Sequence, residues 1–261
     1  MINDTNQTTY QSSHIVNYYA QLSQLQPAEA TILNLLKGQL SSMKMLDIGV
    51  GGGRTTKYFA RLVKQYIGID YSAEMIAACQ QRFSNDSSIL LEVGDARDLS
   101  RFNDNYFDFI LFSFNGIDYI SHTERLQVFQ EISRVGKTRG YFLFSTHNLQ
   151  GIEREFNWRK RLNINPISTY VNLVMFGFLR FFNSSLTYQQ LQNSPYAIIR
   201  DESHNFRLKT YYIRPIEQIK QLQTVFSDIK VYSWKTGQEI MNQQDLDSNI
   251  DMWLYYLCLI K

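Results

Sequence analysis

The feature of this sequence that most constrains the fold is a glycine-rich stretch, LDIGVGGGRTT, at residues 46–56. Four glycines lie within five positions, directly after an apolar run and directly before a segment of helical character. Glycine is entropically costly, so such a cluster usually marks a place where the backbone must come close to another group. A strand, a glycine turn and a helix in this order predict an α/β unit with a ligand beside the turn.

Short apolar runs alternate with helical segments through the first half of the chain. Five of these runs predict strands, most of them buried and parallel: residues 43–50, 66–70, 89–96, 106–114 and 140–148. Ser72 is suited to the N-cap of the helix after the second strand. Ser121 and Glu124 form an S-x-x-E capping box for the helix after the fourth. The alternation predicts an α/β domain with a mostly parallel sheet.

The alternation stops after residue 148. An aromatic-rich helical segment and strand-like runs follow, and then Pro215 opens a helix before two final strands. We expect one domain with four parts: an N-terminal helical lid at 1–42, a cofactor-binding core at 43–148, a substrate-side insertion at 149–212, and a C-terminal helix and strand hairpin at 213–261.

Composition narrows the function classes. The net charge of +2 is too small to suggest a nucleic-acid footprint. Cys79 and Cys258 are far apart and have no metal-type spacing, so no metal is expected. The N-terminus lacks the apolar region of a signal peptide, and the most apolar stretch, residues 170–182, is too short to span a bilayer. These features predict a cytoplasmic protein without a membrane span.

The pattern around the glycines excludes two common ligands. A P-loop needs G-x-x-x-x-G-K-[ST], whereas Arg54 stands five residues after Gly49. Arg54 also occupies the third glycine position of the dinucleotide fingerprint G-x-G-x-x-G. What remains is D-x-G-x-G-x-G, formed by Asp47, Gly49, Gly51 and Gly53. An acid inside the motif would repel a phosphate and suits a ligand with a positive group.

With this motif, residues 43–148 and the last 50 residues resemble the class I S-adenosylmethionine-dependent methyltransferases. The resemblance implies that Asp70 binds both ribose hydroxyls, that Asp95 in Gly94-Asp95-Ala96 binds the adenine amino group, and that Tyr71 and Met75 flank the ribose and adenine. Residues 104–120 resemble the family's fourth strand and active-site exit. Phe112 and Phe114 in that run, and Tyr19 from the N-terminal lid, complete the expected cofactor contacts.

The resemblance also completes the predicted fold. The ending YYLCLIK resembles the family's final antiparallel hairpin. The expected architecture is therefore a doubly wound, mostly parallel seven-stranded sheet with an antiparallel last strand, plus a lid insertion of helices and strands. The cofactor would be S-adenosylmethionine and the product S-adenosylhomocysteine.

The chemistry leaves no obligatory catalytic signature. The sulfonium methyl group is already activated, so the protein must chiefly align a nucleophile and exclude water. His147, at the end of the fifth strand, is the preferred base or substrate anchor because imidazole accepts protons near neutrality. Asn115 and Asp118 follow the fourth strand and should face the methyl group, and His204 in the insertion is the second choice of base.

The modest insertion and the absence of a basic stripe favour a small-molecule acceptor, such as an amine, a sugar or a natural-product intermediate. Three alternatives stay open: an RNA methyltransferase, a nicotinamide-dependent oxidoreductase of similar fold, and a non-catalytic protein that binds S-adenosylmethionine. The sequence leaves the attacking atom and the oligomeric state undetermined.

Overall fold

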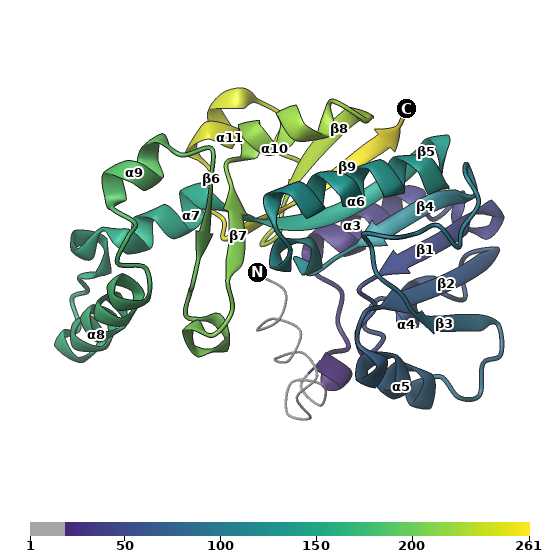
Figure 1. Ribbon diagram of the computed structural model, residues 1–261, viewed down its shortest axis with the longest axis horizontal. Helices are drawn as coiled ribbons and strands as arrows, with labels where there is room; N and C mark the ends of the chain where they lie inside the picture. The colour runs from purple at the N-terminus through teal and green to yellow at the C-terminus, as the bar shows by residue number, and fades with distance from the viewer. Residues whose placement is uncertain (1–18) are drawn as a thin grey trace.

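The structure is a computed structural model that describes residues 19–261, apart from the side chains of residues 203 and 204. Its centre is a parallel sheet in the order β3-β2-β1-β4-β5 (Figure 1). The strands are β1 (Lys44–Ile48), β2 (Gln65–Asp70), β3 (Ile89–Val93), β4 (Phe107–Phe112) and β5 (Gly136–Asn148). The five strands predicted from the apolar runs are all present, and β5 begins four residues earlier than predicted.

The C-terminal strands complete a seven-stranded sheet. β9 (Trp253–Ile260) runs antiparallel to β5 over Tyr141 to His147, and β8 (Phe226–Ser233) runs antiparallel to β9. The mostly parallel sheet with an antiparallel ending is therefore confirmed.

The insertion adds two strands that the seven-stranded prediction lacks. β6 (Tyr196–Ile199) and β7 (Thr210–Ile213) form an antiparallel hairpin. β7 also pairs with the last two residues of β5, His147 and Asn148. β5 is long enough to pair with β9 along most of its length and with β7 at its carboxyl end. Within residues 19–261 the sheet consequently has nine strands.

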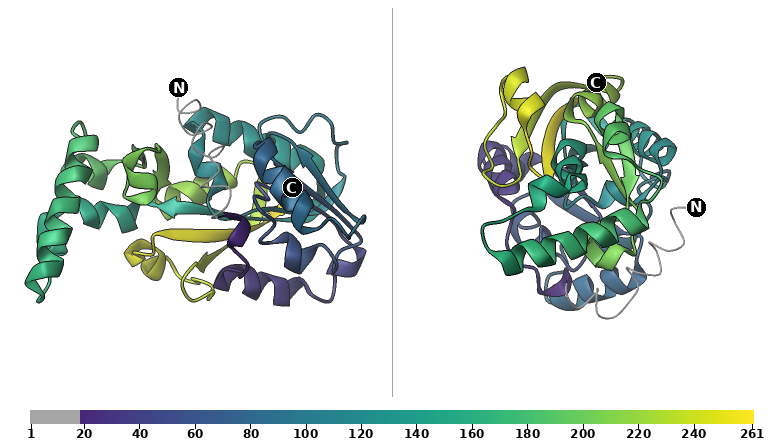
Figure 2. Two further views of the ribbon diagram at one scale, coloured as in Figure 1. Left: turned by 90° about the horizontal axis from the view of Figure 1, so that it is seen from below. Right: turned by 90° about the vertical axis from the view of Figure 1, so that its left-hand side faces the viewer.

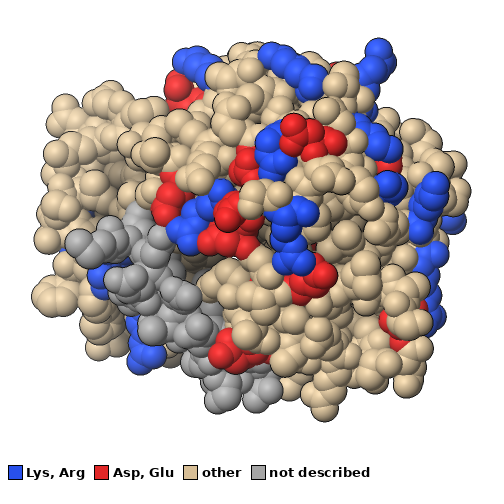
Figure 3. Space-filling view, turned by 45° about the vertical axis from the view of Figure 1, so that its right-hand side comes forward, with Lys and Arg blue, Asp and Glu red and all other residues tan. Residues whose placement is uncertain are grey.

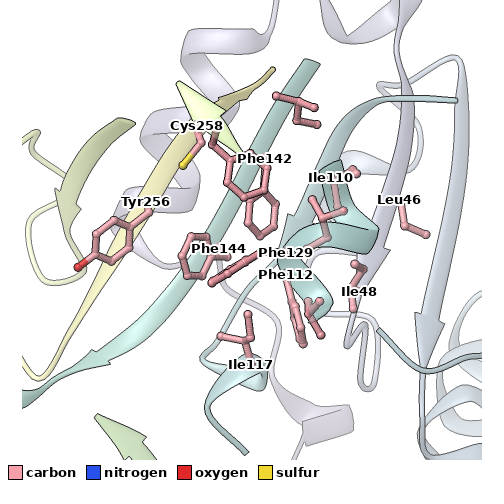
Figure 4. Packing of buried hydrophobic residues seen from close by; sticks show 14 of the residues in the cluster. Leu46, Ile48, Ile110, Phe112, Ile117, Phe129, Phe142, Phe144, Tyr256 and Cys258 are labelled. Atoms are coloured by element: carbon pink, nitrogen blue, oxygen red, sulfur yellow. The ribbon is translucent and has the colours of Figure 1, made fainter. Parts of the chain in front are cut away.

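Helices cover both faces of the sheet, as in a doubly wound fold. One core contains side chains from α3 (Pro27–Leu36), α4 (Thr56–Phe59) and α5 (Ala73–Arg82). The opposite core contains side chains from α6 (His122–Val135), α10 (Pro215–Leu222) and α11 (Gln243–Ser248). In the second core, Phe129 of α6 packs edge-on against Phe144 of β5, which stacks on Phe142 (Figure 4). This aromatic packing holds β5, and with it the site at its carboxyl end.

Local signals in the sequence set the helix starts correctly. The Ser72 side chain accepts a hydrogen bond from the Met75 amide, and the Ser121–Glu124 capping box is present. The segment of helical character that follows the glycines forms only a short α-helix, α4, over Thr56–Phe59. The amide of Lys64 already bonds to the carbonyl of Met43, so the chain must turn early to enter β2.

The insertion forms a separate lobe at one end of the molecule (Figure 1). Its small hydrophobic core includes Leu149, Leu179, Leu191, Ile199 and Tyr212. Its helices are α7 (Leu149–Glu153), α8 (Pro166–Phe182) and α9 (Tyr188–Asn193), with 3-10 turns η3 (Arg154–Phe156), η4 (Trp158–Arg161) and η5 (Ser203–Phe206). Two further 3-10 turns are η1 (Leu40–Ser42) and η2 (Gly116–Tyr119).

Candidate active site

A cavity of about 320 Å³ lies at the carboxyl ends of β1, β2 and β4. The chain leaves β1 for β2 on one side and β4 lies on the other, so this is the switch point where open α/β sheets bind ligands. The volume is at the lower end of the range for cofactor and small-molecule sites.

Most of the residues predicted to contact the cofactor meet in this cavity. Those that line it are Tyr19, Asp47, Gly49, Gly51, Asp70, Tyr71, Met75, Gly94, Asp95, Ala96, Phe112 and Phe114. Gly53 does not line it; a Cβ there would collide with Phe83 and Cys79 of the α5 region. Gly53 therefore allows close packing of the loop on α5.

The glycine loop has the conformation that its composition predicts. Gly49 and Gly51 have φ angles of +66° and +53°, in the left-handed region that side chains rarely adopt. A Cβ at Gly49 would lie 3.1 Å from the Phe112 ring, whereas one at Gly51 would meet no atom within 4 Å. The loop thus packs on β4 at one glycine and leaves open space at the other.

Asp70 joins the loop to the end of β2. Its Oδ2 accepts a hydrogen bond from the Gly51 amide and its Oδ1 accepts one from the Ser72 amide, both at 2.9 Å. Each carboxylate oxygen can accept a second hydrogen bond, which suits a vicinal diol. Burial raises the pKa of Asp70 to about 6, although the two amides partly offset the shift.

Asp47 lines the floor of the cavity and also has a structural function. Its Oδ2 accepts hydrogen bonds from the hydroxyls of Thr55 (2.5 Å) and Tyr66 (2.6 Å). These contacts join β1 to Thr55, which follows the glycine loop, and to Tyr66 of β2. Burial raises the pKa of Asp47 to about 6 as well, against the lowering effect of the two hydroxyls.

At the other end of the cavity, Asp95 is held by Arg97. The guanidinium of Arg97 donates to both Asp95 oxygens, and it also forms an ion pair with Glu124 at 2.5 Å. The Asp95 carboxylate is therefore fixed in position while remaining partly exposed. Met75 is buried beside it on α5, and Tyr71 is 40% exposed at the rim.

The structure assigns a role to Arg54 that the sequence did not predict. Its guanidinium forms a two-pronged ion pair with buried Glu29 of α3, at 2.5 and 2.7 Å, and lies 4.8 Å from the centre of the Phe114 ring. Ser113 and Tyr255 also donate hydrogen bonds to Glu29. This cluster fastens the N-terminal helix to the glycine loop and to the end of β4. In the sequence, Arg54 indicates only that the third glycine of the dinucleotide fingerprint is missing.

The catalytic candidates gather just behind the Phe114 side of the cavity. Nδ1 of His147 lies 2.7 Å from Oδ2 of Asp118, and Nε2 lies 3.4 Å from the side-chain amide of Asn115. The same Asp118 oxygen accepts the His147 backbone amide, while Oδ1 accepts from Arg125 and Thr146 at 2.5 Å. Asp118 is fully buried with both oxygens engaged, so it can influence a substrate only through His147.

These candidates are not equally close to the cavity. His147, Asn115 and Asp118 are absent from its lining, although their neighbours Phe114, Gly116 and Tyr119 belong to it. The His147 side chain is 11% exposed, and its ring lies 4.9 Å from that of Tyr212 and 6.1 Å from that of Trp253. His204 belongs to η5, and its side chain lies outside the described part of the structure.

Comparison with known proteins agrees with this geometry. A family model described as a methyltransferase domain matches residues 46–144. The Bacillus subtilis protein YqeM, named as a methyltransferase, is 29% identical over 106 residues, which cover 40% of this chain and 42% of that protein. The match thus spans less than half of the relative's length.

Two solved structures resemble the whole chain. The PH0226 protein of Pyrococcus horikoshii is 19% identical with a TM-score of 0.61, covering 97% of this chain and 99% of that one. The N-methyltransferase NodS of Bradyrhizobium japonicum, solved with S-adenosylhomocysteine, is 13% identical with a TM-score of 0.54, covering 99% of each chain. At these identities the likeness shows a shared fold.

The fold and the site define a class of protein. The chain has the architecture of S-adenosylmethionine-dependent methyltransferases, in agreement with the family and the cofactor predicted from the sequence. The match to the methyltransferase-domain model covers residues 46–144, which include most of β1, all of β2 to β4 and most of β5.

The raised pKa of Asp70 predicts that cofactor affinity depends on pH. Hydrogen bonds from a diol favour the ionised carboxylate, so binding should weaken as the pH falls through about 6. One linked proton limits the loss to about tenfold per pH unit. Calorimetric titrations between pH 5 and 8 measure it, and Asp70→Asn should remove most of the slope. If cofactor affinity depends on pH as steeply in that variant, another group causes the effect. Asp47 is the first candidate, because its pKa is also raised to about 6.

Proposed function

We propose that this protein transfers the methyl group of S-adenosylmethionine to a small-molecule acceptor by in-line displacement. The observation that carries the proposal is the cavity at the switch point, with the Asp70 carboxylate held at one side and the glycine loop open at Gly51. In this proposal residues 43–148 hold the cofactor, and parts of 1–42 and 149–212 cover the acceptor.

The chemistry of the lining fits the cofactor. Asp70 offers two anchored acceptor oxygens for the ribose hydroxyls, and Asp95 offers a fixed carboxylate for the adenine amino group. Buried Met75 supplies an apolar surface for a flat ring. Buried Asp47, at the opposite end, suits a positively charged amino group. When bound, S-adenosylmethionine supplies an activated methyl group.

The acceptor would lie between Phe114, Tyr119 and His147. Asp118 accepts the Nδ1 proton of His147, which leaves Nε2 as the acceptor nitrogen. The side-chain amide of Asn115 lies 3.4 Å from Nε2 and orients the ring, and an entering acceptor would displace this long contact. In this arrangement His147 takes the proton that an attacking hydroxyl releases, while a neutral amine would use the same nitrogen as an anchor.

Surface charge supports a small acceptor rather than a nucleic acid. On the face shown in Figure 3, basic and acidic residues lie beside one another and form no broad patch of one sign. Ion pairs of the described residues include Arg97–Glu124 and Arg134–Glu131. A protein that tracks a phosphate backbone needs a basic stripe in place of such compensated charges.

The first test is calorimetric titration with S-adenosylmethionine, S-adenosylhomocysteine and NADH in parallel. The expected result is binding of the two sulfur compounds at micromolar concentrations and no binding of NADH. Screening of small amines, sugars and phenols for methyl transfer then identifies the acceptor. Binding of NADH alone would overturn the proposal in favour of an oxidoreductase, and salt-dependent RNA affinity would redirect it to an RNA substrate.

A further inference from the structure

α8 exposes its apolar side and turns its more polar side toward the protein. The helix lies at the end of the molecule farthest from β3. It projects from the body in Figure 1 and in the left view of Figure 2. Within α8, all of whose residues the structure describes, only Leu179 is buried. A helix that packs on a globular core normally has the reverse orientation.

The exposed side chains form one continuous stripe. They recur at spacings of three and four residues, which places them on one face of the helix. The stripe consists of Ile167, Tyr170, Val171, Val174, Phe178 and Phe181. Ile167, Tyr170 and Phe181 are 74%, 70% and 75% exposed. Contiguous apolar surface of this kind marks an interaction site in a soluble protein.

Polar side chains on the opposite face anchor the helix to the insertion lobe. The Asn172 amide donates to the carbonyl of Arg161 at 3.0 Å. Asn183, at the C-terminal end, donates to the carbonyl of Arg200 at 2.8 Å and accepts the amide of the same residue. These contacts fix the rotation of α8 about its axis. The outward direction of the stripe is therefore set by the structure, and the stripe cannot turn inward without breaking them.

The charge around the stripe points to an anionic partner. Residues 156–200 contain no Asp or Glu, and they contain five basic residues. Beside the N-terminal end of α8, η4 presents exposed Trp158, Arg159 and Lys160. Arg161, the next residue, is neutralised by Glu155 and Glu202 from outside this acid-free segment. An apolar stripe flanked by tryptophan and exposed cations matches the boundary between acyl chains and lipid headgroups.

We propose that α8 and η4 form a docking surface for a bilayer that contains anionic lipids. At 17 residues and 1.5 Å per residue, α8 is about 25 Å long. No helix within residues 19–261 is long and apolar enough to cross a membrane. α8 therefore lies in the plane of the surface, with the stripe among the acyl chains and Arg159 and Lys160 at the phosphates. A second copy of this chain is the other possible occupant, but it presents the same acid-free segment and offers no anions to the exposed cations beside the stripe.

The test is flotation of the whole protein with lipid vesicles. The probes are vesicles of phosphatidylcholine alone and vesicles with about one third phosphatidylglycerol, at low and at physiological salt. The expected result is partition onto the anionic vesicles, weakened by salt. Val171→Glu with Val174→Glu should reduce partition by at least about tenfold, because two apolar side chains leave the stripe. Arg159→Gln with Lys160→Gln should reduce it severalfold and remove most of the salt dependence.

Matched variants keep the test specific. Leu35→Glu with Met241→Glu makes the same charge change at exposed apolar residues away from α8, and Lys37→Gln with Lys64→Gln removes two exposed cations elsewhere. Both should float like the unaltered protein, and circular dichroism should show that every variant is folded. Absence of partition at low salt would overturn the proposal. So would equal loss in the Leu35/Met241 variant, or a concentration-dependent dimer that only the Val171/Val174 variant abolishes.

Discussion

Asp70→Ala is expected to weaken the binding of S-adenosylmethionine and S-adenosylhomocysteine by about 2 kcal/mol or more, roughly thirtyfold. In the proposed binding mode, the substitution removes a charged acceptor of two ribose hydrogen bonds. It also frees the amides of Gly51 and Ser72, which the carboxylate now holds at 2.9 Å. The glycine loop would lose its tie to β2, so the cofactor would have to order the loop when it binds. Calorimetry with each ligand measures the effect.

Asp108→Ala provides the matched control for this experiment. Asp108 also belongs to a strand of the parallel sheet and accepts bonds from a backbone amide and a side chain, those of Lys44 and Lys137. It lies on β4, outside the cavity lining. The control should keep the affinity of the unaltered protein. Unchanged affinity in a folded Asp70→Ala variant would remove Asp70 from the proposed binding site.

Much of the proposed cofactor-binding part of the site could be predicted, because each of its sequence signals lies within one strand or one loop. The positions of Gly49 and Gly51 follow from a strand that ends where the next helix must begin, and a left-handed turn needs glycine there. Asp70 follows because it ends the adjacent parallel strand, and the carboxyl ends of such strands meet at one edge. The parallel pairing of β1 and β2 thus brings the glycine loop and Asp70 together, and the prediction needs no knowledge of contacts between distant segments.

The features that the sequence did not predict depend on contacts between distant segments. Glu29 and Arg54 pair across 25 positions, and they are joined by Ser113, which directly follows β4, and by Tyr255 of β9. No periodicity in the sequence encodes that pairing. The pairing of β7 with the end of β5 is similar, because two residues of overlap leave no pattern to detect.

The orientation of α8 is a related case. Its apolar positions have helical periodicity, and periodicity normally predicts a face that packs on the core. The anchoring contacts of Asn172 and Asn183 reverse that expectation. Two short polar side chains determine which face points outward, because they bond to the backbone of Arg161 in η4 and of Arg200 directly after β6. A hydropathy pattern does not detect such contacts.

His147→Gln is expected to lower turnover by about 10²- to 10⁴-fold for a hydroxyl acceptor while sparing cofactor affinity. Glutamine keeps a side chain of similar reach but cannot accept the proton. Asp118→Asn should lower turnover as well, because an amide no longer fixes the Nδ1 proton of His147. It should also lower the melting temperature, since buried Arg125 loses its ionic partner.

The pH profile separates a base from an anchor, using the acceptor that screening identifies. If His147 is the base, kcat of the unaltered protein rises with pH, and this rise disappears in His147→Gln. If His147 only anchors the acceptor, the variant has a higher KM and the same pH dependence of kcat. His122→Gln is the control, since His122 also bonds through Nδ1 but to Tyr211, outside the cavity lining. Full activity with an unchanged profile in His147→Gln would exclude both functions and leave the Asp118–His147 pair a structural support for the end of β5.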